Sequence, residues 1–101
     1  MHVHSVYFSL HDNSDTAKQH LIDECKQYLA AHPGIVFFAC GVLTPDLNRP
    51  VNDRDWDVGL HIVFQDQATH DQYQVDALHN EFVARNKDTW AKVRVFDTTA
   101  A

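Results

Sequence analysis

Alternation of apolar and polar residues predicts three β-strands, and a continuous apolar run predicts a fourth. The alternating segments are residues 3–10, 56–64 and 90–97. Such a period of two is typical of a strand that is buried on one face only. The fourth segment, residues 35–43, is apolar throughout and rich in β-branched and aromatic side chains, so we expect a strand buried on both faces.

Helical periodicity connects these strands. Apolar residues recur at helical spacing after Ser14, which can cap a first helix, and Pro33 predicts that this helix ends near His32. A short helix over 66–73 and a longer one over 75–86 precede the last strand. The order is β-α-β-β-α-β, which predicts an α+β, ferredoxin-like fold: a four-stranded antiparallel sheet with the helices on one face.

Length and charge limit the possible functions. The chain has 101 residues, which suits a single domain spanning residues 1–101. It carries 14 acidic and 8 basic residues, for a net charge of −6, so we expect neither a nucleic-acid partner nor a membrane surface. We expect a cytoplasmic protein with reduced thiols, because only two cysteines occur and no signal peptide is visible at the start.

The sheet face away from the helices is predicted to mix aromatic and polar side chains. Its expected members are Ser5, Tyr7, Asp57, His61, Val63, Trp90, Lys92, Arg94 and Phe96. Exposed aromatic patches usually mark an interaction surface. We therefore expect a homodimer that packs this open face against its two-fold copy, although an antiparallel sheet can also leave such a face in water.

Several short motifs, taken in order, resemble one protein family. They are His4 followed by the strand VYFSL, the pair Trp56-Asp57, the stretch Phe64-Gln65-Asp66, the spacing Tyr73-x5-His79-x2-Phe82, and the closing segment Val93–Asp97. Together they span nearly the whole chain, which resembles the stress-responsive alpha/beta barrel domain, or Dabb, family. The family pattern often reads His-Pro-x-His before the last phenylalanine, whereas this chain has Asp76-Ala77-Leu78-His79.

The resemblance implies a dimeric α/β barrel in which the sheets of two subunits close on each other. Most members of the family have no assigned activity and are linked to stress responses. A few are similar to cyclases of polyketide intermediates, in which a histidine and a tyrosine near a pocket between helices and sheet transfer protons. Related dimeric barrels include monooxygenases and haem-binding enzymes.

Three residues are candidates for acid–base chemistry. His79 lies on the apolar stripe of the last helix, His4 lies on the strand face that meets the helices, and Tyr73 precedes His79 by six residues. If they converge, they could enolise a poly-carbonyl substrate. The apolar residues expected to line such a ligand site are Val6, Phe8, Leu60, Leu78, Phe82 and Val93. The alternative is that His4 and His79 are core histidines with satisfied hydrogen bonds.

Metal or thiol chemistry is not expected. His2 and His4 share one strand face, but His61 falls on the opposite face, and His11, His20, His32 and His70 are expected in loops or on exposed helix edges. A zinc site needs three or four converging ligands. Cys25 and Cys40 lie in apolar surroundings that disfavour a thiolate. We therefore predict no cofactor and no metal.

Two functions are consistent with these features. The first is a non-enzymatic dimer that binds a small apolar ligand between helices and sheet. The second is a cofactor-independent cyclase or lyase that uses His79 and Tyr73, with a monooxygenase-like or haem-related enzyme as a weaker third possibility. An open cavity beside His79 and Tyr73 would favour the enzyme, and solid packing with both ring nitrogens of His79 satisfied would argue against it.

Overall fold

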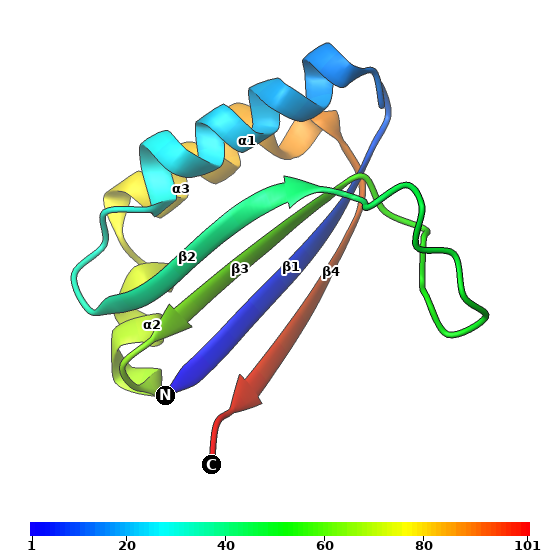
Figure 1. The fold of residues 1–101 in the computed structure, drawn as a ribbon. Coiled ribbons are helices and arrows are strands. Elements are labelled where there is room, and N and C mark those ends of the chain that lie inside the picture. Colours follow the sequence, from blue (N-terminus) through cyan, green and yellow to red (C-terminus); the bar gives the residue numbers. More distant parts are fainter.

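A computed structural model describes all residues, 1–101, as one four-stranded antiparallel sheet with helices on one side (Figure 1). The elements are β1 (His2–Leu10), α1 (Asp15–Leu29), β2 (Ile35–Val42), β3 (Val58–Phe64), α2 (Gln67–Gln74), α3 (Ala77–Asn86), a 3-10 turn (Lys87–Thr89) and β4 (Trp90–Thr99). The strand order is β2-β3-β1-β4. The predicted α+β, ferredoxin-like fold is confirmed, with two helices in the second crossover.

Side-chain caps set the helix starts. The Ser14 hydroxyl accepts a hydrogen bond from the Ala17 N–H at 3.2 Å, and the Asp66 carboxylate accepts one from the Thr69 N–H at 2.8 Å. Each satisfies a backbone donor that the helix itself leaves free. The first helix ends at Leu29, three residues before the predicted His32, because the turn that contains Pro33 begins earlier. None of the helices has the length and apolar composition needed to cross a lipid bilayer.

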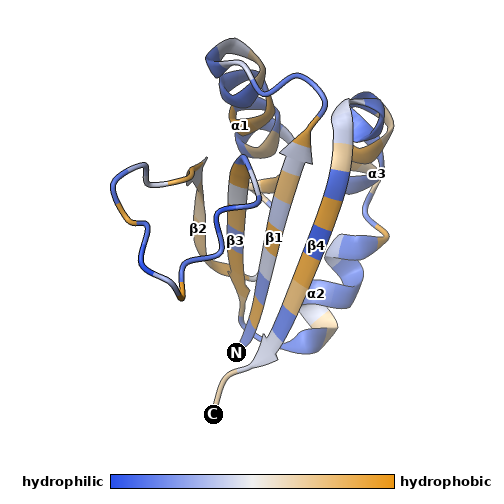
Figure 2. Cartoon of the chain, turned by 90° about the vertical axis from the view of Figure 1, so that its right-hand side faces the viewer, coloured by the Kyte–Doolittle hydropathy of each residue, from blue (hydrophilic) through white to orange (hydrophobic).

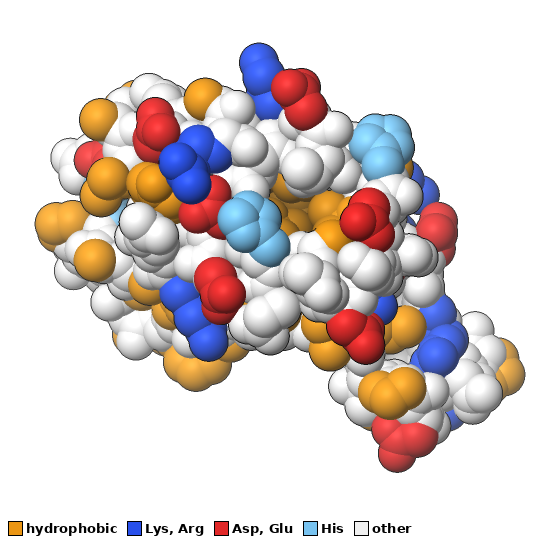
Figure 3. Space-filling view, turned by 90° about the horizontal axis from the view of Figure 1, so that it is seen from above, with side chains coloured by type: hydrophobic (Ala, Val, Ile, Leu, Met, Phe, Trp, Pro, Cys, Tyr) orange, Lys and Arg blue, Asp and Glu red, His pale blue; other side chains and the backbone are white.

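The core lies between the sheet and the helices. Figure 2 shows hydrophobic and polar residues alternating along β4, the pattern of a strand with two different faces. β3 lies in the interior of the sheet, and its inward side chains Leu60, Ile62 and Phe64 are almost fully buried. From α1, Leu21, Leu29 and Cys25 pack against them. Burial of each of these large apolar side chains contributes roughly 1.5–3 kcal/mol. Seen from above, acidic and basic side chains are interspersed over the helices (Figure 3).

The apolar strand β2 is not buried on both faces, and that prediction was wrong. β2 is an edge strand, and Val36 and Phe37 are 59% and 56% exposed. A continuous apolar run cannot distinguish a central strand from an edge strand, because the pattern within one strand does not show whether other strands lie on both sides of it.

Trp90 lies on the opposite side of the sheet from that predicted, and so does Trp56, which alternation with Asp57 had placed on the helix-facing side. β4 contains an irregularity opposite Ser9 and Leu10, which breaks the alternation and turns Trp90 towards the helices, where it packs 5.0 Å from Phe8. β3 begins at Val58 rather than Trp56, and Trp56 packs at 5.0 Å against Tyr7 on the open face.

Candidate functional site

A cavity of about 350 Å³ lies between the sheet and helices α2 and α3 and opens beside β4. Ten of its 15 lining residues are hydrophobic. The predicted ligand-site residues that line it are Val6, Phe8, Leu60, Phe82 and Val93. This size and apolar character are typical of small-molecule sites.

Leu78, the sixth predicted ligand-site residue, does not line this cavity. Leu78 is 50% exposed, and Val75, three residues earlier, is 76% exposed. The predicted stripe assumed one helix from residue 75, whereas α2 ends at Gln74 and α3 starts at Ala77 with Asp76 as its cap. The helical phase therefore changes between the two helices, and the residues at the junction turn outward.

His79 and Tyr73 meet at the wall of the cavity. Tyr73 projects from α2 and His79 from α3, and their ring centroids are 4.8 Å apart. Burial lowers the pKa of His79, assisted by the nearby His4 and His70 rings, so the imidazole is neutral at pH 7. Burial raises the pKa of Tyr73, which keeps its hydroxyl protonated. The Nδ1 atom of His79 is buried without a hydrogen-bond partner.

His4 reaches the same cavity from β1 and pairs with a residue of β4. His4 and Asp97 lie directly opposite each other in the sheet, and His4 Nδ1 is 2.7 Å from Asp97 Oδ1. Burial lowers the pKa of His4, although the contact with Asp97 acts in the other direction. Partial burial of Asp97 is outweighed by the hydrogen bonds from His4 and His2, so the pKa of this carboxyl is lowered and it stays ionised.

Three predicted site residues are thus brought to one cavity, and further polar residues that the sequence did not reveal join them. Asp97 and His70 also line the cavity. His70 was expected on an exposed helix edge, but its side chain is only 12% exposed. The sequence did contain a signal for this position of His70, because His70 lies three residues before Tyr73 and therefore on the same helix face.

The two histidine environments differ. His4 has the protein partner expected of a core histidine, whereas His79 has a buried nitrogen without one. A buried polar atom without a partner carries a free-energy cost, so the His79 ring is not the fully satisfied core histidine of the alternative prediction.

Comparisons with known proteins agree with this architecture. A search of curated proteins by sequence found no match. A Dabb family protein with a ferredoxin-like fold from Mesorhizobium loti superposes with a TM-score of 0.79 at 23% identity, over 99% of this chain and 96% of that one. A dimeric ferredoxin-like protein of unknown function from Thermobifida fusca gives 0.78 at 15% identity, over 98% and 90% of the two chains.

A hydroxynitrile lyase from Passiflora edulis has the same fold, with a TM-score of 0.78 at 16% identity over 99% of this chain and 93% of that one. At these identities the structural similarities show the fold alone. The family model of the stress responsive A/B barrel domain matches residues 3–100. The chain therefore belongs to the stress responsive A/B barrel domain (Dabb) family.

Proposed function

We propose that this protein binds a small, largely apolar molecule with a polar group at one end in the cavity beside β4. The observation that carries the proposal is the lining itself: ten hydrophobic residues, Tyr73 with its hydroxyl among them, form most of the wall, and His4, His70, His79 and Asp97 add polar side chains. A bound carbonyl compound would place its hydrocarbon part against Val6, Phe8 and Phe82. Its oxygen would then lie at the imidazoles and the tyrosine hydroxyl.

A thermal-shift series tests this binding. Cyclohexanone and acetophenone are suitable probes, with the matched hydrocarbons as controls for apolar contact alone. Ligands that bind only the folded state raise the melting temperature in a concentration-dependent way. We expect the ketones to raise it more than the hydrocarbons do. No shift with any probe at millimolar concentration would contradict the proposal.

Proton transfer is a second candidate function, and the environment of His79 favours it. A neutral imidazole that lines the cavity can accept the α-proton of a bound ketone, leaving the electron pair in an enolate. The protonated Tyr73 hydroxyl can donate a hydrogen bond to the enolate oxygen. Return of the proton from His79 regenerates the ketone, so no cofactor is required. The hydroxynitrile lyase from Passiflora edulis is an example of a lyase on this fold.

Deuterium exchange at the α-carbon of the ketone, followed by NMR, measures this step directly. We expect the wild-type protein to accelerate exchange, and His79→Gln to reduce the acceleration by about 10²-fold or more. His11→Gln is the matched control, because His11 is exposed and outside the cavity. Equal exchange rates for wild type and His79→Gln would exclude His79 as the base.

We also propose a homodimer that forms through the open sheet face. Phe96 and Phe37 are 53% and 56% exposed there, and Tyr7, Trp56 and Phe96 form a continuous aromatic group with centroid distances of 5.0 and 5.9 Å. The Thermobifida fusca neighbour is described as dimeric. Sedimentation at micromolar concentration tests the proposal, and a single species of 11.6 kDa would contradict it.

A further inference from the structure

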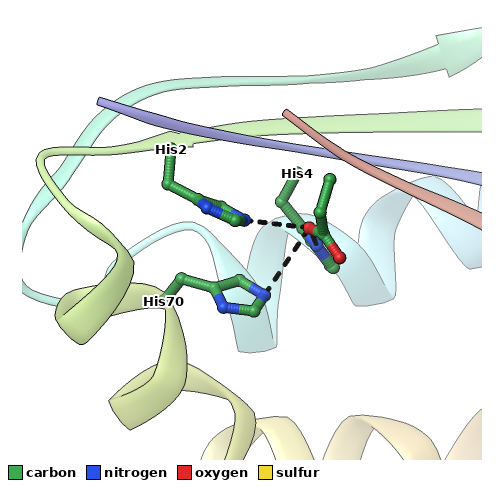
Figure 4. Close-up of side chains that lie close together, drawn as sticks. His2, His4 and His70 are labelled. Carbon is green, nitrogen blue, oxygen red and sulfur yellow. Dashed lines mark hydrogen bonds and ion pairs between the residues drawn. The ribbon is translucent and has the colours of Figure 1, made fainter. Parts of the chain in front are cut away.

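Three imidazoles and one carboxylate meet where β1, β4 and α2 come together (Figure 4). The nitrogen atoms His2 Nε2, His4 Nδ1 and His70 Nε2 lie 2.9, 2.7 and 3.7 Å from the same oxygen, Asp97 Oδ1. All four ligand atoms lie within 4.8 Å of one another. We propose that His2, His4, His70 and Asp97 form a binding site for a divalent transition-metal ion of the Zn²⁺ type.

The donor set and its geometry suit such an ion. Imidazole nitrogen and carboxylate oxygen are ligands of Zn²⁺, and related first-row ions accept the same set. Four ligands at the usual bond length of about 2.1 Å stand about 3.4 Å from one another in a tetrahedron. The contacts to Asp97 Oδ1 range from 2.7 to 3.7 Å and all pairs of ligand atoms lie within 4.8 Å, so shifts of roughly 1–1.5 Å would admit the ion.

The surroundings hold the ligands in place. His70 Nδ1 is 3.0 Å from the carboxylate of Asp71, and this second contact directs His70 Nε2 towards the cluster. A carboxylate behind a histidine ligand is a recurring feature of metal sites, where it fixes the ring and raises its basicity. The Gln74 side-chain nitrogen is 3.4 Å from His70 Nε2 and would have to turn aside.

The three rings and the carboxylate lie close enough together to share one cation. The His2 and His4 ring centroids are 4.3 and 4.9 Å from that of His70, and their side chains are only 9% and 6% exposed. Three protonated rings at these distances would repel each other, whereas three neutral rings and one carboxylate can share a metal ion. Asp97 is 41% exposed, which leaves an entry path from solvent.

No metal site was predicted from the sequence, because His2 and His4 alone shared a strand face and His61 fell on the opposite one. The structure adds His70 from α2 and Asp97 from β4. Neither His79 nor Tyr73 belongs to the cluster. His4, His70 and Asp97 belong to both sites, but titration with zinc alone reports on the cluster and the ketones report on the cavity, so failure of one proposal is distinguishable from failure of the other.

Titration of tag-free protein with Zn²⁺ alone, followed by calorimetry, tests the site. We expect one ion per chain with micromolar or tighter affinity at pH 7.5, and a rise in melting temperature on addition of zinc. His70→Ala and Asp97→Asn should each weaken binding at least about tenfold. His20→Ala is the matched control, because it removes an exposed helix histidine outside the cluster, and should leave binding unchanged.

Circular dichroism of each variant separates lost binding from lost folding. If His70→Ala proves unstable, Asp97→Asn still tests the site, because asparagine has the same shape as aspartate. Affinity should fall sharply below pH 6, because metal ligands must be deprotonated. The absence of wild-type binding at 100 μM zinc would overturn the proposal. Unchanged affinity in both folded variants would overturn it as well.

Discussion

Truncation of Phe96 should dissociate the proposed dimer. Phe96 lies on β4 at the open face, contacts Tyr7, and is 53% exposed in the single chain. An aromatic side chain of this size presents roughly 200 Å², so dimerisation would bury roughly 110 Å² more per subunit. At about 25 cal/mol per Å² this corresponds to about 2–3 kcal/mol per subunit, and to about 5 kcal/mol per dimer because both copies contribute.

The dissociation constant of Phe96→Ala should therefore rise by at least tenfold and by up to about 10³-fold, since buried area converts only partly into affinity. Sedimentation velocity over a concentration series measures this constant. Val75→Ala is the matched control: Val75 is even more exposed, at 76%, but lies at the α2–α3 junction. A dimer that is equally weakened by both substitutions, or by neither, would refute the open-face interface.

Three further outcomes follow from the structure. Val95→Trp should block ketone-induced thermal shifts with little loss of stability, because Val95 lines the cavity and is 50% exposed. Gly34→Ala should destabilise the fold by about 1–3 kcal/mol in urea titrations, because Gly34 has φ +91° and a Cβ there would collide with Thr69. Burial lowers the pKa of both His4 and His79, so the unfolded chain binds more protons than the folded one near the ordinary histidine pKa. The melting temperature should therefore fall as the pH drops below about 6.5, and His79→Gln should weaken that dependence.

Much of the cavity wall could be predicted because it depends on local periodicity alone. Alternation with a period of two is enough to put His4, Val6 and Phe8 on one face of the first strand. The i, i+3 spacing of the last helix does the same for His79 and Phe82. These residues face the core wherever the strands are placed in the sheet, so strand order was not needed.

The polar cluster could not be predicted because it depends on strand order and on a helix break. Asp97 continues the face of Val93 and Val95, but only the pairing of β4 with β1 brings it opposite His4. His70 is positioned by the helix that ends at Gln74. In a single long helix the directions of the His70 and His79 side chains would be fixed relative to each other. The break between α2 and α3 removes this constraint and lets each histidine approach the cavity from its own helix.

The opening of the cavity and the access to the cluster have one structural cause. Along the row of side chains that runs from β3 through β1 to β4, Leu60 is 1% exposed, Val6 5% and Val95 50%. The helices thus cover β3 and β1 and leave the edge strand β4 uncovered. In the next row the same gradient places a buried His4 beside Asp97, whose side chain is 41% exposed. A charged side chain that is ionised and partly hydrated can remain at this edge at low cost, whereas at the position of Leu60 it would be fully desolvated. At the β4 end of these rows the helix-facing surface can therefore carry both a solvent-accessible opening and a carboxylate that pairs with buried imidazoles.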